Sequence, residues 1–224
     1  MLKFSGIGSA FNAKEGNTSA YIEQDDSFVL IDCGSTVFES VKPKIDSVDP
    51  NNIHIFITHT HADHIGSLGT TIDYINHVKK GKANIYFPCE QLKEILDLMK
   101  VSADGYTLHK ELNNTVNRLA FSFYQTSHIL GNCYGLLIKH DNQTICYSGD
   151  CNEITLLQDF LQGKINIMYL DVTDKDSTVH VTYRDLVNLI VKPIDRDRLY
   201  LMHLNEDFNK IKAINDGFNL AERE

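Results

Sequence analysis

The chain has 224 residues, a length that suits one large domain or two small ones. Hydrophobic residues make up 42% of it, enough for a substantial core, and 30 acidic against 21 basic side chains give a net charge of −9. That acidic balance argues against a protein that grips a long polyanion, because phosphate backbones are bound by patches of Lys and Arg. A small anionic substrate stays compatible with it, because bound cations can reverse the local charge.

Nothing in the sequence predicts export or insertion into a membrane. The first residues, MLKFSGIGSAF, lack the basic start and the long apolar stretch of a signal peptide. No apolar run approaches the ~18 residues of a membrane-spanning helix. The five cysteines are odd in number and contain no CxxC pair, which favours reduced thiols over a disulfide framework. We therefore expect a cytoplasmic protein without membrane spans.

The first half of the chain begins with β-type segments and then alternates strand and helix. Four strands are predicted first, joined by polar or glycine-bearing turns: LKFSGIG, SAYIEQ, SFVLID and NIHIFIT. Apolar residues then recur at spacings of three and four, which predicts one helix with a single buried face: Ile65, Leu68, Ile72, Ile75 and Val78. Gly81 stands where that helix is expected to stop. The strand ANIYF and the helix EQLKEILDLM follow.

The second half repeats this order. Three strands are predicted, the last two joined by a DNQ turn that favours a hairpin: LAFSFYQT, CYGLLIKH and QTICYSGD. A helix over 156–161 and the strand KINIMYLDV come next. Thr182 with Asp185 marks the start of a helix that Pro193 ends. The strand RLYLMH and a helix over 207–216 close the chain, and the whole order predicts two sheets with helices outside.

The segment ITHTHADHIGSL crowds four metal-ligating side chains into six residues, directly after a predicted strand. His59 and His61 in an extended segment can point one way, while Asp63 and His64 at the start of a helix point another. Imidazole nitrogen and carboxylate oxygen are the ligands that zinc and similar metals take, at about 2.0–2.2 Å. The spacing therefore suits two cations held side by side.

Further ligands are expected downstream, where strands end in polar turns. Three segments present one each: His128 in QTSHILGN, Asp150 in CYSGDCN and His203 in LYLMHLNED. Asp32, at the end of an earlier strand, is either a supporting partner of the site or an ordinary turn residue.

These residues resemble the metallo-β-lactamase superfamily. HTHADH is similar to its His-x-His-x-Asp-His signature, and the later His, Gly-Asp and His follow in the family's order. The resemblance implies a single α/β (α+β) domain over residues 1–224, a four-layer αβ/βα sandwich of two mixed sheets with helices outside. It also implies two divalent metal ions, Zn²⁺ first and Mn²⁺ as the alternative. The resemblance implies that the first metal is held by His59, His61 and His128. It implies that the second metal is held by Asp63, His64 and His203, and that both metals share Asp150 as a bridge.

A pair of such metals suits hydrolysis, because metals about 3.5–4 Å apart lower the pKa of a shared water. Asp63 could accept the proton of that water. The ribonuclease Z branch of the superfamily carries His-Glu-Ala-Thr followed by Gly-His-Ser-Thr, and residues 170–173 (LDVT) and 179–182 (VHVT) match these in part. The partial match implies that His180 protonates the leaving oxygen and that Asp171 orients it. The alternative is a capping or structural role for His180.

Two kinds of phosphodiester are compatible with these motifs. Ribonuclease Z enzymes process tRNA 3′ ends and grip the tRNA with a basic arm inserted between the third ligand segment and the bridging aspartate. Here only the 21 residues 129–149 separate His128 from Asp150, and they read as two strands and a tight turn. The family's Pro and Ser after the histidine are also replaced, by Ile129, Leu130 and Gly131. A long nucleic acid is therefore the less favoured substrate, and the tRNA 3′-processing endonuclease is the alternative function.

The opening segments GSAFN, GNTSAYIE and LIDCGSTVFE resemble compact, arm-less ribonuclease Z-like proteins. These include cyclic nucleotide phosphodiesterases, among them phage anti-Pycsar proteins that destroy cyclic pyrimidine messengers. The resemblance implies a homodimeric hydrolase that opens a small anionic substrate, a 3′,5′-cyclic nucleotide, to the nucleoside 5′-monophosphate. Four residues are candidates for contacting the base: Tyr134, Asn132, Tyr183 and Asn205.

Two other classes stay open. A β-lactam or thioester hydrolase uses a similar site, but a phosphodiesterase better explains His180. A non-hydrolytic metal-binding or di-iron redox protein is the second alternative. Di-iron relatives usually carry Glu at the position of His61, and a degenerate binder would have lost a ligand, whereas this chain keeps all seven.

Overall fold

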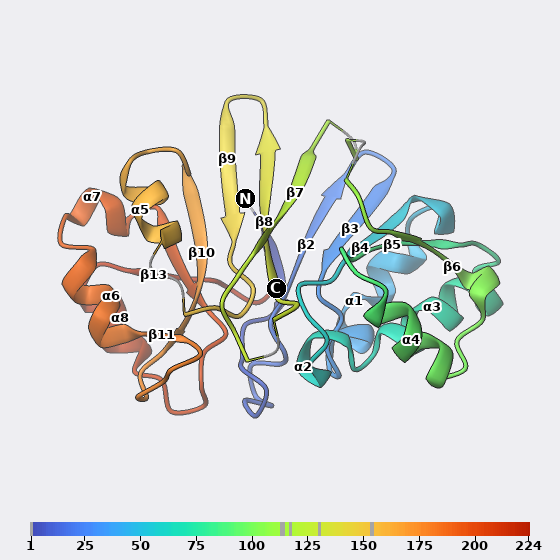
Figure 1. Ribbon diagram of the computed structural model, residues 1–224, viewed down its shortest axis with the longest axis horizontal. Coiled ribbons are helices and arrows are strands. Elements are labelled where there is room, and N and C mark those ends of the chain that lie inside the picture. Colours follow the sequence, from blue (N-terminus) through green and yellow to red (C-terminus); the bar gives the residue numbers. More distant parts are fainter. Residues whose placement is uncertain (1, 113–114, 117, 130, 153–154) are drawn as a thin grey trace.

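The computed structural model describes residues 2–112, 115–116, 118–129, 131–152 and 155–224, so Leu130 of the third ligand segment lies outside the described residues. Two β-sheets pack face to face, and helices cover the outer face of each (Figure 1). This arrangement confirms the predicted class, two mixed sheets with helices outside.

The first sheet has the strand order β1-β2-β3-β4-β5-β6. β1 to β3 are antiparallel, and β3 to β6 are parallel. The strands are β1 Lys3–Gly6, β2 Ser19–Gln24, β3 Ser27–Ile31, β4 Ile53–Phe56, β5 Ala83–Tyr86 and β6 Tyr106–His109. The main helices that accompany them are α1 Val37–Asp46, α3 Leu68–Asp73 and α4 Gln91–Leu98. Short 3₁₀ helices lie at Pro50–Asn52 and Ala103–Gly105.

The second sheet has the order β13-β12-β10-β9-β8-β7, with β11 paired to β10. The predicted hairpin is present between β8 and β9, and the strands from β9 to β13 in the sheet path are parallel. The strands are β7 Ala120–Gln125, β8 Tyr134–His140, β9 Gln143–Tyr147, β10 Ile167–Thr173, β11 Val181–Thr182, β12 Leu199–Met202 and β13 Asn219–Leu220. The helices are α5 Thr155–Leu161, α6 Tyr183–Leu189, α7 Pro193–Arg196 and α8 Lys210–Asn215.

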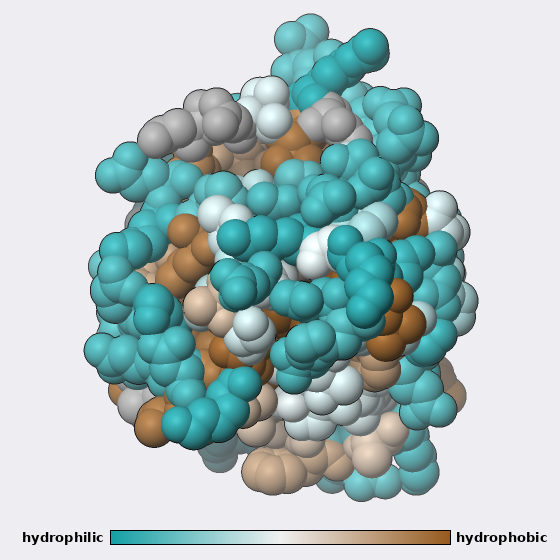
Figure 2. All heavy atoms as spheres, turned by 90° about the vertical axis from the view of Figure 1, so that its right-hand side faces the viewer, coloured by the Kyte–Doolittle hydropathy of each residue, from teal (hydrophilic) through white to brown (hydrophobic). Residues whose placement is uncertain are grey.

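Alternation along the strands divides the buried residues into two cores. In β3, Val29 and Ile31 join the core that lies between the sheets, whereas Phe28 and Leu30 join the core under the helices of the first sheet. Successive side chains of a strand point to opposite faces, so a run that is apolar at every position is buried on both. Figure 2 shows the outside of that helical layer as a mainly hydrophilic surface with small, separated apolar patches.

The single helix predicted over Ile65 to Val78 is wrong in detail. The chain forms α2, Ala62–Ile65, then α3, and then a π-helical turn, Tyr74–Val78. The break falls at Ser67, whose hydroxyl donates to the carbonyl of Gly34 at 2.6 Å and so ties this point to the loop after β3. The wider π turn changes the helical spacing, and Val78, predicted to be buried, is 61% exposed.

α1 is a helix that the sequence did not predict. Its buried residues, Val37, Val41 and Ile45, recur every four positions, but Pro43 interrupts the pattern that would identify a helix. Among the described residues, no helix is both long and apolar enough to cross a membrane.

Candidate metal centre

The HTHADH segment has the local geometry predicted for it. It follows β4 after Ile57 and Thr58, and the backbone is still extended at His61, which precedes the first turn of α2. Asp63 and His64 lie within α2. His59 and His64 are each 1% exposed, so these imidazoles are directed into the protein and not into solvent.

Three histidines and one aspartate form a first cluster. Ligand-type atoms of His59, His61, His128 and Asp150 lie within 4.8 Å of one another. Nε2 of His59 is 3.8 Å, and Nε2 of His128 is 3.7 Å, from Oδ2 of Asp150. The segments that carry these residues follow β4, β7 and β9, so the cluster joins the two sheets at one edge of the sandwich.

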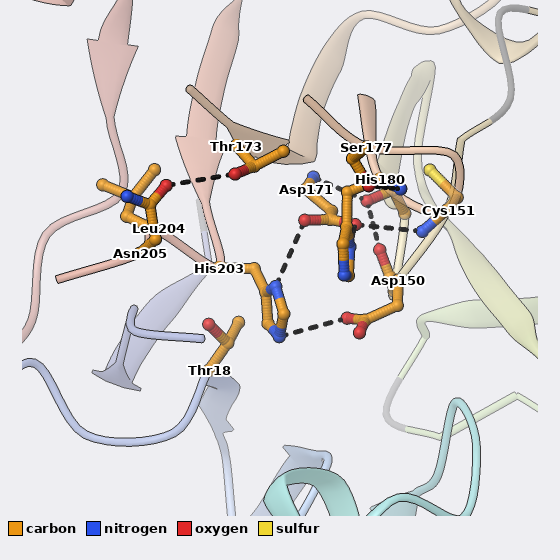
Figure 3. Close-up of polar contacts among 12 residues, drawn as sticks. Thr18, Asp150, Cys151, Asp171, Thr173, Ser177, His180, His203, Leu204 and Asn205 are labelled. Atoms are coloured by element: carbon orange, nitrogen blue, oxygen red, sulfur yellow. Dashed lines mark hydrogen bonds and ion pairs between the residues drawn. The ribbon is translucent and has the colours of Figure 1, made fainter. Parts of the chain in front are cut away.

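A second cluster contains Asp63, His64, Asp150 and His203 within the same mutual distance of 4.8 Å. Nε2 of His64 lies 3.3 Å from Oδ1 of Asp150, and Nε2 of His203 lies 3.4 Å from the same oxygen. Asp150 therefore presents Oδ2 to the first cluster and Oδ1 to the second. Figure 3 shows its carboxylate directed at His203. The seven predicted ligands are thus brought together, with Asp150 in the bridging position.

Three buried atoms in these clusters have no hydrogen-bond partner: Nε2 of His64, Nε2 of His128 and Oδ1 of Asp150. A buried polar atom without a partner costs about 1–3 kcal/mol, so such atoms call for an explanation. All three have free lone pairs when the imidazoles are neutral, which is the state that binds a metal. The clusters therefore fit a dinuclear metal site, and their nitrogen and oxygen donors suit Zn²⁺ and Mn²⁺ alike.

The carboxylates give the site a strong negative potential. Burial would lower the pKa of His203, but the neighbouring Asp150 and Asp171 carboxylates outweigh it and raise that pKa to about 10. Burial would raise the pKa of Asp63, yet the neighbouring His203 and His64 imidazoles hold it far below its ordinary value. This negative potential would attract a pair of divalent cations, and the bound cations would neutralise it.

Asp32 supports the site from behind His64. It is fully buried and accepts hydrogen bonds from the backbone N–H of Thr58 at 2.8 Å and from Nδ1 of His64 at 2.9 Å. With Nδ1 donating to a carboxylate, the neutral ring presents an unprotonated Nε2 to the cluster. Of the two readings of Asp32 from the sequence, the contacts support the one in which it orients a ligand.

Two other ligands are oriented in the same way. Nδ1 of His128 donates to the carbonyl of Val179 at 3.1 Å, and Nδ1 of His203 lies 3.2 Å from Oδ1 of Asp171. In each case the partner of Nδ1 directs Nε2 towards Asp150. The contact of His128 with Val179 was not predicted from the sequence, because Val179 contributes only a backbone carbonyl. Asp171 was predicted to orient His180, and its contact with His203 was not predicted.

His180 lies beside both clusters and is held by Asp171. Nδ1 of His180 donates to Oδ2 of Asp171 at 2.6 Å, and the side chain is 23% exposed (Figure 3). The ring centroid is 5.1 Å from that of His128 and 5.3 Å from that of His203. Burial would lower the pKa of His180, but the hydrogen bond to Asp171 raises it above its ordinary value. The predicted pair is therefore present, with one nitrogen of His180 left for another partner.

Comparison with known proteins places the chain in a family. The family model described as "Anti-Pycsar protein Apyc1" matches residues 1–224. The chain belongs to the Apyc1 family. Curated relatives of that name include one from Bacillus phage 010DV004, 25% identical and covering 92% of this chain and 89% of the relative. Another, from Bacillus phage BSP38, is 28% identical over the same shares of the two chains.

Solved structures confirm the metallo-β-lactamase fold of this Apyc1 family member. A diphosphatase of the PhnP family superposes with a TM-score of 0.78 at 19% identity, over 99% of this chain and 94% of the other. YhfI from Bacillus subtilis gives 0.75 at 18%, and the short form of human tRNase Z gives 0.72 at 18%; both comparisons cover 99% of this chain and 96% of the other. At these identities the likeness concerns the fold alone.

The two His/Asp clusters of this Apyc1 family member open on a cavity of about 660 Å³. Six of the residues discussed above line it: His61, Asp63, His128, Asp150, His180 and His203. Its volume lies within the range of about 300–1,000 Å³ that is usual for small-molecule sites. Phe11 and Ile129, which were not among the predicted site residues, also line this cavity.

Of the four residues considered for contacting a base, only Asn205 lines this cavity. Tyr183 lies in a separate cavity of about 500 Å³, and its hydroxyl donates to Asp216. Tyr134 packs its ring against Phe87. Asn132 is exposed and directed at Gln91. Asp216, Phe87 and Gln91 are not among the residues that line the metal-site cavity.

Proposed function

We propose that this chain is a metal-dependent phosphodiesterase that hydrolyses 3′,5′-cyclic nucleotides to nucleoside 5′-monophosphates. The observation that supports it most is the pairing of two His/Asp clusters across Asp150, with the hydrogen-bonded His180 and Asp171 beside them. Membership of the Apyc1 family over the whole chain supports the cyclic nucleotide as substrate class.

Two divalent cations, Zn²⁺ or Mn²⁺, would be held by the two clusters. The first would take His59, His61, His128 and Asp150, and the second Asp63, His64, His203 and Asp150. When bound, such ions activate water near neutral pH and offset the negative charge that develops on phosphoryl oxygens.

Two side chains of the protein would carry out the proton transfers. Opening the ring to a 5′-monophosphate breaks the bond between phosphorus and O3′, so that oxygen must receive a proton. His180 lines the cavity, and the Asp171 carboxylate favours its protonated form, which suits it to donate that proton. Asp63 lines the same cavity and is the proposed acceptor for the proton of the attacking water.

A tRNA body is a poor fit to this surface. The residues between His128 and Asp150 that the structure describes include the β8–β9 hairpin, in which only residues 141 and 142 separate the strands. The net charge of −9 supplies little basic surface for a polyanion. We therefore propose a small anionic nucleotide, and not a long nucleic acid, as the substrate. A homodimer is the assembly that the family resemblance implies, and its mass can be measured by light scattering.

The direct experiment is a substrate panel with protein loaded separately with Zn²⁺ and Mn²⁺. It should contain purine and pyrimidine 3′,5′-cyclic nucleotides, a pre-tRNA with a 3′ trailer, and bis(p-nitrophenyl) phosphate. We expect 5′-monophosphates from one or more cyclic nucleotides and an intact trailer. Cleavage of the pre-tRNA while every cyclic nucleotide stays intact would replace this proposal with the endonuclease.

A further inference from the structure

Phe11 stands at the tip of a turn that is built onto the metal centre. The backbone N–H of Asn12 donates to the carbonyl of Ser9 at 3.0 Å, which closes the turn around Phe11. The N–H of Ser9 and the side-chain amide of Asn12 both donate to the carbonyl of Leu204, at 3.0 and 2.9 Å. Leu204 directly follows the ligand His203, so the position of the turn is coupled to that of the site.

The residues around Phe11 favour a fixed conformation of this turn. Asn12 is only 3% exposed, although it carries a polar side chain in a loop, because its amide is used to fix the turn. Gly8 allows the turn to close: a Cβ there would lie 2.7 Å from the carbonyl oxygen of Asn12. Phe11 itself contributes little to the core, because it is 93% exposed.

Exposure alone would carry no meaning, because single apolar side chains are common on protein surfaces. Leu98 at the end of α4, for example, is 81% exposed and does not line the metal-site cavity. Phe11 differs in its position, because it lines the same cavity as the metal-ligand residues. Ile129, next to the ligand His128, is 61% exposed and lines that cavity too.

The cavity therefore has a polar interior and, on part of its edge, exposed apolar side chains beside the polar Ser35 and Thr36. Buried carboxylates and imidazoles lie inside, while Ala10, Phe11, Ala13 and Ile129 supply apolar surface. A nucleotide has the same polarity, with a charged phosphate at one end and a flat aromatic base at the other. With the phosphate at the clusters, the base would come to the apolar part of that edge.

We infer that Phe11 is the platform on which the nucleobase of the substrate stacks. The inference rests on the proposed function and adds a residue that determines how the substrate is held. An aromatic face accepts any base, because every base has a π-face, so Phe11 would give affinity for nucleotides without choosing among them. Fixing the backbone of the turn in advance through Ser9 and Asn12 lowers the entropy lost when the base binds.

Fluorescence tests this contact without turnover. The chain has no tryptophan, so Phe11→Trp provides a single reporter at the mouth of the cavity. We expect AMP and CMP to quench it in a saturable way, and ribose 5-phosphate, which has the same phosphate but no base, to leave it unchanged. Leu98→Trp is the matched control and should respond to none of the three. Equal responses to AMP and ribose 5-phosphate, or none to either, would overturn the inference.

Kinetics test it with the substrate. Phe11→Ala should raise KM for cyclic nucleotides roughly 5- to 100-fold, the range expected when one base–aromatic stack is lost. Phe11→Tyr should keep KM within about twofold of the wild-type value. Phe11→Leu, which is apolar but has no ring, should raise KM as Phe11→Ala does. An unchanged KM in Phe11→Ala would refute the stack.

The controls separate this inference from the proposed function. If the wild-type protein leaves all cyclic nucleotides intact while AMP still quenches Phe11→Trp, the proposed reaction fails and the base contact stands. If Phe11→Ala changes the mass in solution, measured by light scattering, and AMP leaves Phe11→Trp unquenched, the residue belongs to a contact between copies of the chain. The stacking role is then excluded.

Discussion

The Asp32 carboxylate accepts a hydrogen bond from Nδ1 of His64 at 2.9 Å, and both side chains are almost completely buried. Asp32 occupies this position with a positive φ of 63°, a backbone conformation that Asp and Asn adopt more readily than most residues. The pair links the end of β3 to α2 and therefore couples the first sheet to a candidate ligand of the second metal.

Replacing Asp32 by Asn should weaken metal binding. Asn tolerates the positive φ and has nearly the same side-chain shape as Asp. It lacks the negative charge that holds His64 in the tautomer with a free Nε2. The loss of such a supporting carboxylate typically lowers metal affinity about 10- to 100-fold. Competition with a chelator, followed by elemental analysis, measures this.

Asp25→Asn is the matched control for that variant, because Asp25 also has a positive φ, 51°, but is exposed. It should bind metal like the wild type. Unchanged metal affinity in Asp32→Asn would mean that His64 is oriented without its carboxylate partner.

His180→Ala should lose turnover and keep metal. General acid catalysis typically contributes about 10²- to 10⁴-fold, so we expect kcat to fall by that amount. His180 is not one of the seven candidate ligands, so metal content should stay at the wild-type level. His77→Ala, which removes a histidine whose side chain is 67% exposed, serves as control. Loss of metal from His180→Ala would identify it as a ligand, in line with its place in a third group with Asp150, Asp171 and His203.

The cluster of candidate metal ligands was predictable because it depends on local spacing and on where strands end. His59 to His64 occupy one short segment, and Asp150 and His203 each follow a strand, so a parallel arrangement brings them to one edge. The arrangement of two sheets with helices outside followed from the same pattern of alternating strands and helices. These features need no knowledge of contacts between distant residues.

Other features depend on such contacts, and spacing does not reveal them. The helix predicted through Ser67 is broken by a hydrogen bond to Gly34, more than thirty residues earlier. Phe11 lines the cavity only because its turn is bound to Leu204, near the other end of the chain. Tyr183 was one of the candidates for contacting the base, yet it lines a different cavity.

Removing metal should destabilise the protein. The clusters bring the Asp63 and Asp150 carboxylates together with five histidines, three of them buried. A ligand that binds only the folded state stabilises it by about 2.7 kcal/mol at a hundred times its Kd. For a domain of this size, that corresponds to a shift in Tm of roughly 5–11 °C. Thermal unfolding with a chelator, and again after addition of excess Zn²⁺ or Mn²⁺, measures the shift.

Asp150→Asn is the internal control for the thermal experiment, since it removes the carboxylate shared by both clusters. Its Tm should respond much less to added metal than that of the wild type. If chelation and metal addition leave the wild-type Tm unchanged, the clusters do not bind these cations in the folded state.

The two sheets should depend on Phe56 for their contact. This residue is fully buried in the core between the sheets, and its ring stacks at a centroid distance of 4.3 Å on both Tyr86 of the first sheet and Phe121 of the second. Phe56→Ala should lower the free energy of unfolding by about 3–5 kcal/mol, as is typical when a buried aromatic ring is removed. Urea unfolding followed by circular dichroism measures it. Phe11→Ala, at a ring that is 93% exposed, should change stability by no more than about 0.5 kcal/mol. Equal losses in the two variants would mean that the packing of Phe56 against both sheets contributes nothing beyond what an exposed ring does.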